Sequence, residues 1–120
     1  MPLLGRKAKE LVDWSGHADV HIEVQDMSDP KSFINEAERL MALVDGDPLL
    51  KAHARAGRIT LVLPGLSTLA AVILAAWHGA YGYFPRIRWY VRDSKTGAFS
   101  LSTKHIDLQQ IRYDARRGRG

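Results

Sequence analysis

The central segment of this chain, residues 58–78, limits its fold more than any other part of the sequence. Residues 58–63 read Arg-Ile-Thr-Leu-Val-Leu, a short β-rich run in which apolar and polar positions hardly alternate. This pattern is typical of a strand that is covered on both faces. After the turn Pro64-Gly65, residues 68–78 are apolar around most of a helical circumference. We therefore predict a central strand, a turn and the most buried helix of the protein.

The segments on the N-terminal side carry different periodicities. Residues 18–26 alternate between apolar and polar side chains, which predicts a half-buried strand. Residues 30–44 place apolar side chains at three- and four-residue spacing after Ser28-Asp29-Pro30, which is typical of a capped amphipathic helix. Residues 49–56 add one or two helical turns, and residues 7–14 carry a short amphipathic pattern that predicts a first helix.

The C-terminal side adds two β-rich runs and a last helix. Residues 86–93 alternate as a strand does, residues 93–97 offer hairpin-turn chemistry, and residues 98–103 return antiparallel at the sheet edge. Residues 106–116 are predicted to form a short helix whose packing residues are Ile106, Leu108, Ile111 and Tyr113. The order strand, helix, strand, helix, strand implies parallel pairing with right-handed crossovers. We predict an α/β fold, Rossmann-like, with a mostly parallel sheet flanked by helices and an antiparallel edge hairpin.

Length and charge predict how the chain is divided. A chain of 120 residues buries a core without disulfides or a structural metal, so we expect a single α/β ligand-binding domain over residues 1–111. Residues 112–120 hold four arginines against one aspartate and so supply +3 of the net charge of +4. We predict that they form a basic, flexible tail. The nearly neutral body has no broad basic face, so duplex DNA is not an expected partner.

Cysteine content and the apolar runs bear on localisation. The chain contains no cysteine, which excludes disulfides, thiolate catalysis and cysteine-rich zinc sites. The longest apolar run, Leu69–Trp77, has nine residues, whereas a span of the bilayer needs roughly 20. The N-terminus shows no secretory leader pattern. We expect a cytoplasmic protein without a membrane partner.

The turn Pro64-Gly65-Leu66-Ser67-Thr68 is the predicted ligand site. In open α/β sheets, ligands bind beyond the carboxyl ends of the strands, where a helix N-terminus presents unpaired N–H groups. Gly65 lets the backbone approach a ligand closely, and the hydroxyls of Ser67 and Thr68 can donate to a phosphate oxygen. The alternative is structural: Gly65 permits the turn and Ser67 caps the helix.

A second part of the site is expected at the end of the predicted first strand. Asp26, Met27 and Ser28 follow that strand and should lie on the same edge of the sheet as the turn. They would line one side of a shared cleft. The alternative is that Ser28 and Asp29 cap the next helix within a solvated turn.

Arginines and histidines are the remaining candidates for chemistry. Arg86, Arg88 and Arg92 share one strand face with Tyr90, a combination that binds phosphates and stacks a base, although a solvent-exposed sheet face has the same pattern. No predicted helix holds the pair His17 and His21 on one face and no cysteine lies nearby, so no metal site is predicted. No Walker loop, paired-carboxylate motif, Ser-His-Asp pattern or dinucleotide fingerprint is present, and no cofactor is expected.

Residues 63–79, which read Leu-Pro-Gly-Leu-Ser-Thr-Leu-Ala-Ala-Val-Ile-Leu-Ala-Ala-Trp-His-Gly, and the closing Gly-Tyr-Phe-Pro at residues 82–85 resemble small CRISPR-associated proteins of type III systems. Residues 106–112 and 114–116 look like the C-terminal segment of the same proteins. Together these segments make up about a quarter of the chain. The N-terminal half carries no such resemblance.

The resemblance implies a fold related to the nucleotide-sensing (CARF) domains of these systems. The implied ligand is a cyclic oligoadenylate, first of all cyclic tetra-adenylate, and the implied role is to switch off antiviral signalling by sequestering or slowly cleaving this second messenger. A symmetric ring suits a homodimer or a higher homo-oligomer. Cleavage would need no metal, because a ribose 2′-hydroxyl can attack its own phosphate when it is held in line. His78 and Arg88 are the candidate acid or charge stabilisers for this ring nuclease activity.

Two other classes of function remain open from the sequence. The basic tail and the many surface arginines favour a protein-interaction adaptor. They also fit a general nucleic-acid-binding module, whose binding would depend steeply on salt. For His78, the alternative to chemistry is packing or stabilisation by the helix dipole, because it lies at the end of an apolar helix.

Overall fold

The computed structural model describes residues 10–16 and 20–118, which form an α/β fold with a mixed sheet. Four strands make the main sheet, in the order β1 (Leu11–Asp13), β2 (Thr60–Val62), β3 (Arg86–Arg88) and β6 (Ile106–Asp107). Two further strands, β4 (Tyr90–Arg92) and β5 (Phe99–Leu101), pair as a separate hairpin. The helices are α1 (Pro30–Asp45), α2 (Pro48–Arg55), α3 (Ser67–Tyr81) and α4 (Leu108–Gly118).

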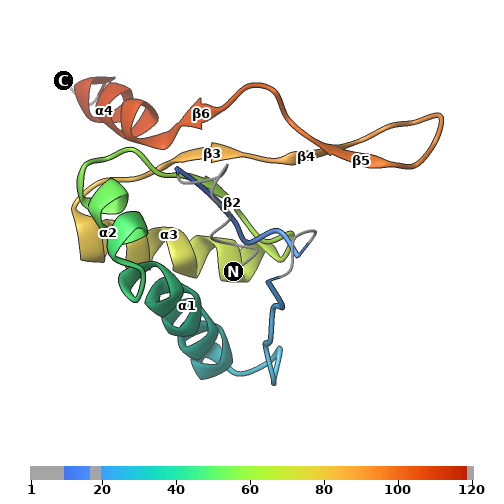
Figure 1. Cartoon of the computed structure of the whole chain (residues 1–120), viewed down its shortest axis with the longest axis horizontal. Coiled ribbons are helices and arrows are strands. Elements are labelled where there is room, and N and C mark those ends of the chain that lie inside the picture. The colour runs from blue at the N-terminus through green and yellow to red at the C-terminus, as the bar shows by residue number, and fades with distance from the viewer. Residues whose placement is uncertain (1–9, 17–19, 119–120) are drawn as a thin grey trace.

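Three neighbouring strands of the main sheet run parallel. Strand β2 pairs with β1 on one side and with β3 on the other, both in parallel, and β6 closes the sheet antiparallel to β3. Helices α1 and α2 connect β1 to β2, and α3 connects β2 to β3. Figure 1 shows these three helices together on one face of the sheet. The predicted α/β class, the mostly parallel sheet and the central place of β2 are confirmed.

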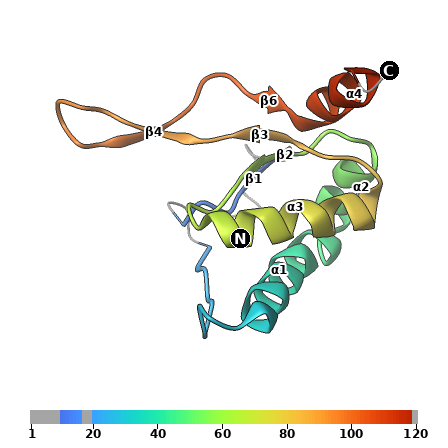
Figure 2. The ribbon, with the colours of Figure 1, turned by 180° about the vertical axis from the view of Figure 1, so that it is seen from behind.

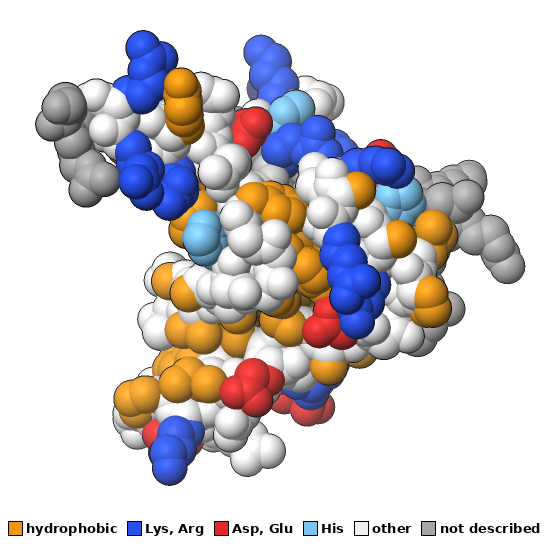
Figure 3. Space-filling view, turned by 90° about the vertical axis from the view of Figure 1, so that its left-hand side faces the viewer, with side chains coloured by type: hydrophobic (Ala, Val, Ile, Leu, Met, Phe, Trp, Pro, Cys, Tyr) orange, Lys and Arg blue, Asp and Glu red, His pale blue; other side chains and the backbone are white. Residues whose placement is uncertain are grey.

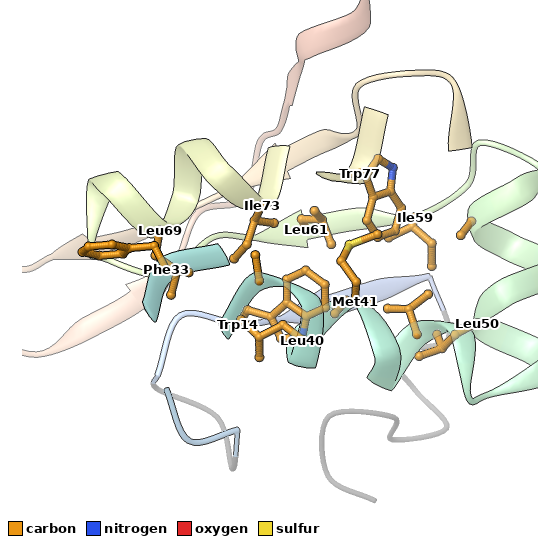
Figure 4. Close-up of a cluster of buried hydrophobic side chains, with 14 residues drawn as sticks. Trp14, Phe33, Leu40, Met41, Leu50, Ile59, Leu61, Leu69, Ile73 and Trp77 are labelled. Carbon is orange, nitrogen blue, oxygen red and sulfur yellow. The ribbon is translucent and has the colours of Figure 1, made fainter. Parts of the chain in front are cut away.

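The core lies between the sheet and these three helices. Figure 4 shows Leu61 of β2 pointing toward Ile73 and Trp77 of α3, with Leu40 of α1 on the other side of the cluster. The ring centroids of Trp14 and Trp77 are 6.4 Å apart in an edge-to-face contact. Both indoles are fully buried. Because each large buried apolar side chain contributes about 1.5–3 kcal/mol, this cluster is the main source of stability.

Carboxylates cap the starts of α1 and α2, and the first of these caps was predicted. Asp29 caps α1 by accepting from the N–H of Lys31, and Pro30 occupies the first turn. Asp47 caps α2 in the same way, with bonds from the N–H groups of Leu49 and Leu50. The predicted helices at residues 30–44 and 49–56 are therefore confirmed, and both begin where a carboxylate meets free N–H groups.

The prediction for residues 7–26 is wrong in two places. Residues 11–13, expected in a helix, form strand β1, and the predicted strand at residues 18–26 has no strand partner in its described part. Val12 and Trp14 are buried while Asp13 between them is not, which is the two-residue period of a strand. Residues 20–24 still alternate, since Val20, Ile22 and Val24 pack against the core, but they lie along helix α1 without a ladder.

The strand predicted at residues 86–93 divides at Trp89. Its first part, β3, belongs to the main sheet, and its second part, β4, leaves it to pair with β5. The hairpin is antiparallel as predicted, but it is separate from the sheet, whose edge is occupied by β6 instead. Figure 2 shows the hairpin projecting beyond the helices.

The last helix also differs from the prediction. Helix α4 begins at Leu108 and continues to Gly118, so the segment predicted as a flexible tail is helical over residues 112–118. The packing predicted for Ile106, Ile111 and Tyr113 is wrong, because they are 38%, 54% and 54% exposed, while Leu108 is partly buried. No residue of α4 is buried. The helix touches the body mainly next to β3.

Charge is distributed unevenly over the surface. Figure 3 shows Lys and Arg side chains gathered toward the end of the molecule that carries α4, and most of the visible Asp and Glu side chains toward the opposite end, where α1 lies. Within the described residues, no helix is both long enough and apolar enough to cross a bilayer.

Candidate functional site

A cleft of about 410 Å³ opens where the parallel strands end, between the start of α3 and the continuation of β3 toward β4. This volume lies in the range of sites for small ligands, which is about 300–1,000 Å³. Ten residues line the cleft: Ser15, Leu63, Pro64, Gly65, Ser67, Ala70, Ile87, Arg88, Trp89 and Tyr90. Its position matches the general rule that ligands bind beyond the carboxyl ends of parallel strands.

The turn from β2 into α3 forms one wall. Leu66 is the N-cap residue and its side chain makes no capping bond, so the structural alternative in which Ser67 caps the helix is wrong. The helix starts at Ser67, which is exposed, and the N–H of Ala70 donates to the carbonyl of Leu66 at 3.0 Å. The N–H groups of the first turn have no intrahelical partner. This end of the cleft is therefore suited to an anion.

Arg88 stands on the opposite wall and is held in place by Ser102. Its Nε donates to the carbonyl of Ser102 at 2.8 Å, and its Nη2 donates to the same oxygen. A guanidinium has more N–H donors than this carbonyl takes, so Arg88 keeps donors for a ligand. The Ser102 carbonyl thus fixes the orientation of the positively charged Arg88 guanidinium at the cleft.

Ser102 also holds the backbone beside Arg88. It is 7% exposed, and its Oγ accepts from the N–H of Trp89 at 3.2 Å and donates to the carbonyl of Lys104 at 2.8 Å. Its own N–H donates to the carbonyl of Trp89 at 2.7 Å. Sequence reasoning missed this residue, because a serine in a run of polar residues carries no signal that it will be buried.

The third polar group of the cleft joins β1 to β4. Asp13 accepts from the Tyr90 hydroxyl at 2.9 Å and from the hydroxyl and N–H of Ser15 at 2.6 and 3.0 Å. Burial, followed by the bond to Asp13, raises the pKa of Tyr90 above its ordinary value. Tyr90 therefore stays a neutral hydroxyl at neutral pH. Asp13 was also missed, because it lies in a segment predicted as helix.

The structure brings together part of the predicted ligand site. Pro64, Gly65 and Ser67 line the cleft, while Leu66 and Thr68 belong to the same segment but not to the lining. Arg88, one of the two candidate catalytic residues, lies in the cleft as well.

The second predicted half of the site is not at the cleft. Asp26, Met27 and Ser28 precede α1 and do not line it. Asp26 accepts from the N–H and the hydroxyl of Ser28 at 2.9 and 2.6 Å, which is the local turn named as the alternative. The expectation failed because residues 20–26 are not a strand of the sheet. The end of β1, with Asp13 and Ser15, takes that position.

The other candidates lie away from the cleft. His78 is eleven residues after Ser67 on α3, which is about 16 Å along the helix axis, and its ring packs on Phe84 at 4.4 Å. Arg86 lines a different pocket with Tyr83 and Asp107, and Arg92 lies on the hairpin. The packing alternative therefore fits His78.

Metal binding has no support in the described part of the chain. There, no group of three or more His, Asp or Glu side chains is placed to hold a metal ion. His17 of the pair considered above lies outside the described residues.

Comparisons of the chain with protein-family models, with curated proteins and with solved structures found no match. The chemistry of the cleft must therefore be inferred from its own residues. A helix start and a fixed guanidinium form a site for an anion, and Leu63, Ala70 and Ile87 add an apolar surface beside it. A mostly apolar lining with a few placed polar groups is typical of small-molecule sites.

Proposed function

We propose that the cleft binds a cyclic oligoadenylate, with cyclic tetra-adenylate as the first ring to test, and that the protein lowers the level of this second messenger in type III CRISPR defence. The observation that carries the proposal is the pairing of the α3 start at Gly65 and Ser67 with the fixed guanidinium of Arg88 across one cleft. The resemblance of residues 63–79 to small proteins of these systems supports the choice of ligand.

The phosphodiester groups of such a ring are singly charged anions. One of them can accept from the free N–H groups at the start of α3 and from the Ser67 hydroxyl, while the Arg88 guanidinium neutralises its charge. Binding needs both walls of the cleft, because the α3 start and Arg88 each supply only some of the hydrogen-bond donors to the phosphate. A relation to the CARF domains is part of the proposal, and parallel strands with a cleft at their carboxyl ends are compatible with it.

We propose a homodimer as the binding form. A ring of four nucleotides is larger than one cleft of about 410 Å³, and it presents the same phosphate repeatedly around its axis. Two copies related by a two-fold axis would offer the same turn to opposite phosphates. The ring would then be enclosed instead of lying on one surface.

Sequestration and slow cleavage differ in what the cleft must do after binding. For cleavage, the ribose 2′-oxygen attacks the adjacent phosphorus and the bond to the 5′-oxygen breaks, which leaves a 2′,3′-cyclic phosphate and a 5′-hydroxyl. The proton of the 2′-hydroxyl is released and another is taken up by the 5′-oxygen. Arg88 would stabilise the charge on phosphorus oxygens. His78 has no part in this step, because it lies at the far end of α3.

The test is incubation of excess protein with radiolabelled cyclic tetra-adenylate in chelator, read by native gel and by denaturing chromatography. A shifted and intact ring supports sequestration, and a shifted ring converted to linear products supports a metal-independent nuclease. Arg88→Ala should weaken binding by about tenfold or more, because a bond to a charged group is lost. Arg92→Ala, on the hairpin and outside the cleft lining, is the matched control and should bind normally. No shift with the natural protein would overturn the proposal.

Helix α4 favours a second candidate, the protein-interaction adaptor. Ile111 and Tyr113 are exposed on it beside Arg112, Arg116 and Arg117. Replacing Ile111 and Tyr113 by serine should abolish partner capture and leave ring binding unchanged if this reading is right. A general nucleic-acid-binding module would instead bind without preference for rings and lose affinity steeply with salt.

A further inference from the structure

The lining of the cleft combines two kinds of surface. Gly65, Ser67 and Arg88 are polar, charged or backbone-exposing, and they face a ligand anion in the function proposed above. Leu63, Ala70 and Ile87, which follow β2 or belong to α3 and β3, add an apolar surface. A phosphate alone would not need this second surface, because apolar side chains offer it no hydrogen bonds.

Trp89 is the largest apolar side chain of the lining. It lies in the cleft lining and is 40% exposed, whereas Trp14 and Trp77 are fully buried. Part of its apolar indole is therefore accessible at the cleft, where an aromatic ring can stack on a flat ligand.

The backbone of Trp89 is fixed on both sides. Its N–H donates to the Oγ of Ser102 at 3.2 Å and its carbonyl accepts from the N–H of Ser102 at 2.7 Å. These bonds hold the residue at the point where the chain leaves the main sheet, between β3 and β4. The indole is thus presented from a rigid position instead of a free loop.

We propose, on the basis of the function proposed above, that Trp89 is the nucleobase platform of the cleft and that it selects rings of purines over rings of pyrimidines. A base that stacks on the indole is covered on its other side by Leu63, Ala70 and Ile87, with its phosphate at Ser67 and Arg88. Stacking strength grows with the size of the flat ring, so it separates purines from pyrimidines but not adenine from guanine. Trp89 is accordingly a specificity-determining residue.

Fluorescence isolates this residue, because Trp89 is the exposed indole among three tryptophans. Titration of the full chain with cyclic tetra-adenylate should quench the tryptophan emission in step with the native-gel shift. Trp89→Phe should keep affinity within a fewfold but lose the quench, since phenylalanine still stacks. Trp89→Ala should lose both the quench and about tenfold or more in affinity.

Controls separate the platform from the fold and from the phosphate site. Val91→Ala changes another exposed apolar residue, which is 48% exposed on β4 and outside the cleft lining, and should leave affinity and quench unchanged. Far-ultraviolet circular dichroism checks that the variants fold. Cyclic tetra-uridylate should bind the natural protein about tenfold or more weakly than the adenylate ring, and Trp89→Ala should remove most of that difference.

The outcomes distinguish the two proposals. A gel shift with the natural protein that Trp89→Ala leaves unchanged, or equal affinity for the adenylate and uridylate rings, would overturn the base platform and leave the proposed function standing. A natural protein that shifts no adenylate ring would overturn both. Both proposals are supported if the adenylate ring shifts the natural protein and quenches its tryptophan emission, and if Trp89→Phe still binds the ring but shows no quench.

Discussion

At the scale of single residues, Ser102 determines how one wall of the cleft is held. It is the only buried residue between Trp89 and Gly118. Its carbonyl accepts from Arg88, and its hydroxyl bonds to the backbone of Trp89 and of Lys104. Arg88 is fixed through the Ser102 carbonyl, and Trp89 through the Ser102 hydroxyl and N–H. A backbone carbonyl cannot be removed by substitution, so the side chain is what a variant can test.

Ser102→Ala should lower the free energy of unfolding by about 1–3 kcal/mol. The reason is that the N–H of Trp89 and the carbonyl of Lys104 each lose a partner in a partly buried setting. Ring affinity should fall as well, while the bond from Arg88 to the carbonyl remains. Urea unfolding followed by circular dichroism measures the first effect. Ser100→Ala, exposed on β5, is the control and should stay within about 0.5 kcal/mol of the natural protein.

At the scale of elements, helix α3 ends at a residue whose backbone has the left-handed conformation. The helix runs through Gly79 and is capped by Gly82, which has a φ of 81°. The N–H of Gly82 donates to the carbonyl of His78 at 2.8 Å. A side chain at this φ is strained, although the space around the position is open.

Replacement by alanine should therefore have opposite effects on stability at the two glycines. Gly82→Ala should destabilise the protein by about 1–2 kcal/mol, because it places a Cβ in the left-handed region. Gly79→Ala should stabilise it by about 0.5–1 kcal/mol, since the residue is exposed, helical and without any atom near the new Cβ. Thermal unfolding of both variants measures the pair. Equal shifts of the same sign would contradict the assignment of the helix end.

The elements also show which parts of the fold could be predicted. Helix α1 was found because its cap and its periodicity are local features of the sequence, whereas the Asp47 cap of α2 was not predicted. The alternation of residues 20–24 correctly gave the side chains that face the core, but alternation does not say which strand, if any, supplies hydrogen-bond partners. The division at Trp89 was not predictable, because it depends on Ser102, thirteen residues away.

The candidate site was predictable to a similar extent. The turn at Pro64, Gly65 and Ser67 was found because strand, glycine turn and helix follow one another in the sequence. Asp13 was missed because the segment that contains it was assigned to a helix, and the Tyr90 bond to it joins residues far apart in the chain. Sequence patterns therefore predicted the wall formed by one continuous segment, and missed the contacts between residues that are far apart in the sequence.

At the scale of the whole molecule, α1 and α3 are joined at the surface as well as in the core. The Tyr81 hydroxyl of α3 donates to the Asp45 carboxylate of α1. Burial first, and then this bond, raises the pKa of Tyr81 above its ordinary value. A phenol with a raised pKa in the folded state ionises first in the unfolded chain. Its contribution to stability is therefore complete below about pH 10 and is lost as the pH rises further.

Tyr81→Phe tests this contribution. At neutral pH the variant should be less stable by up to about 1 kcal/mol, because the bond to Asp45 is lost. Between neutral pH and about pH 11, the natural protein should lose more stability than the variant, which has no phenol at this position. Urea unfolding at the two pH values measures the difference. Parallel losses in the two proteins would contradict the assigned role.

The two walls of the cleft belong to parts of the molecule under different constraints. Leu63, Pro64 and Ala70 sit on elements whose neighbours form the core, whereas Arg88 and Trp89 lead into a hairpin and a helix with almost no buried side chains. Substitutions at exposed positions usually change stability by less than about 0.5 kcal/mol. A substitution of the exposed Trp89, which reaches the cleft from the second wall, is thus tolerated by the fold. Related proteins can diverge in ligand preference there while the first wall and the core are inherited unchanged.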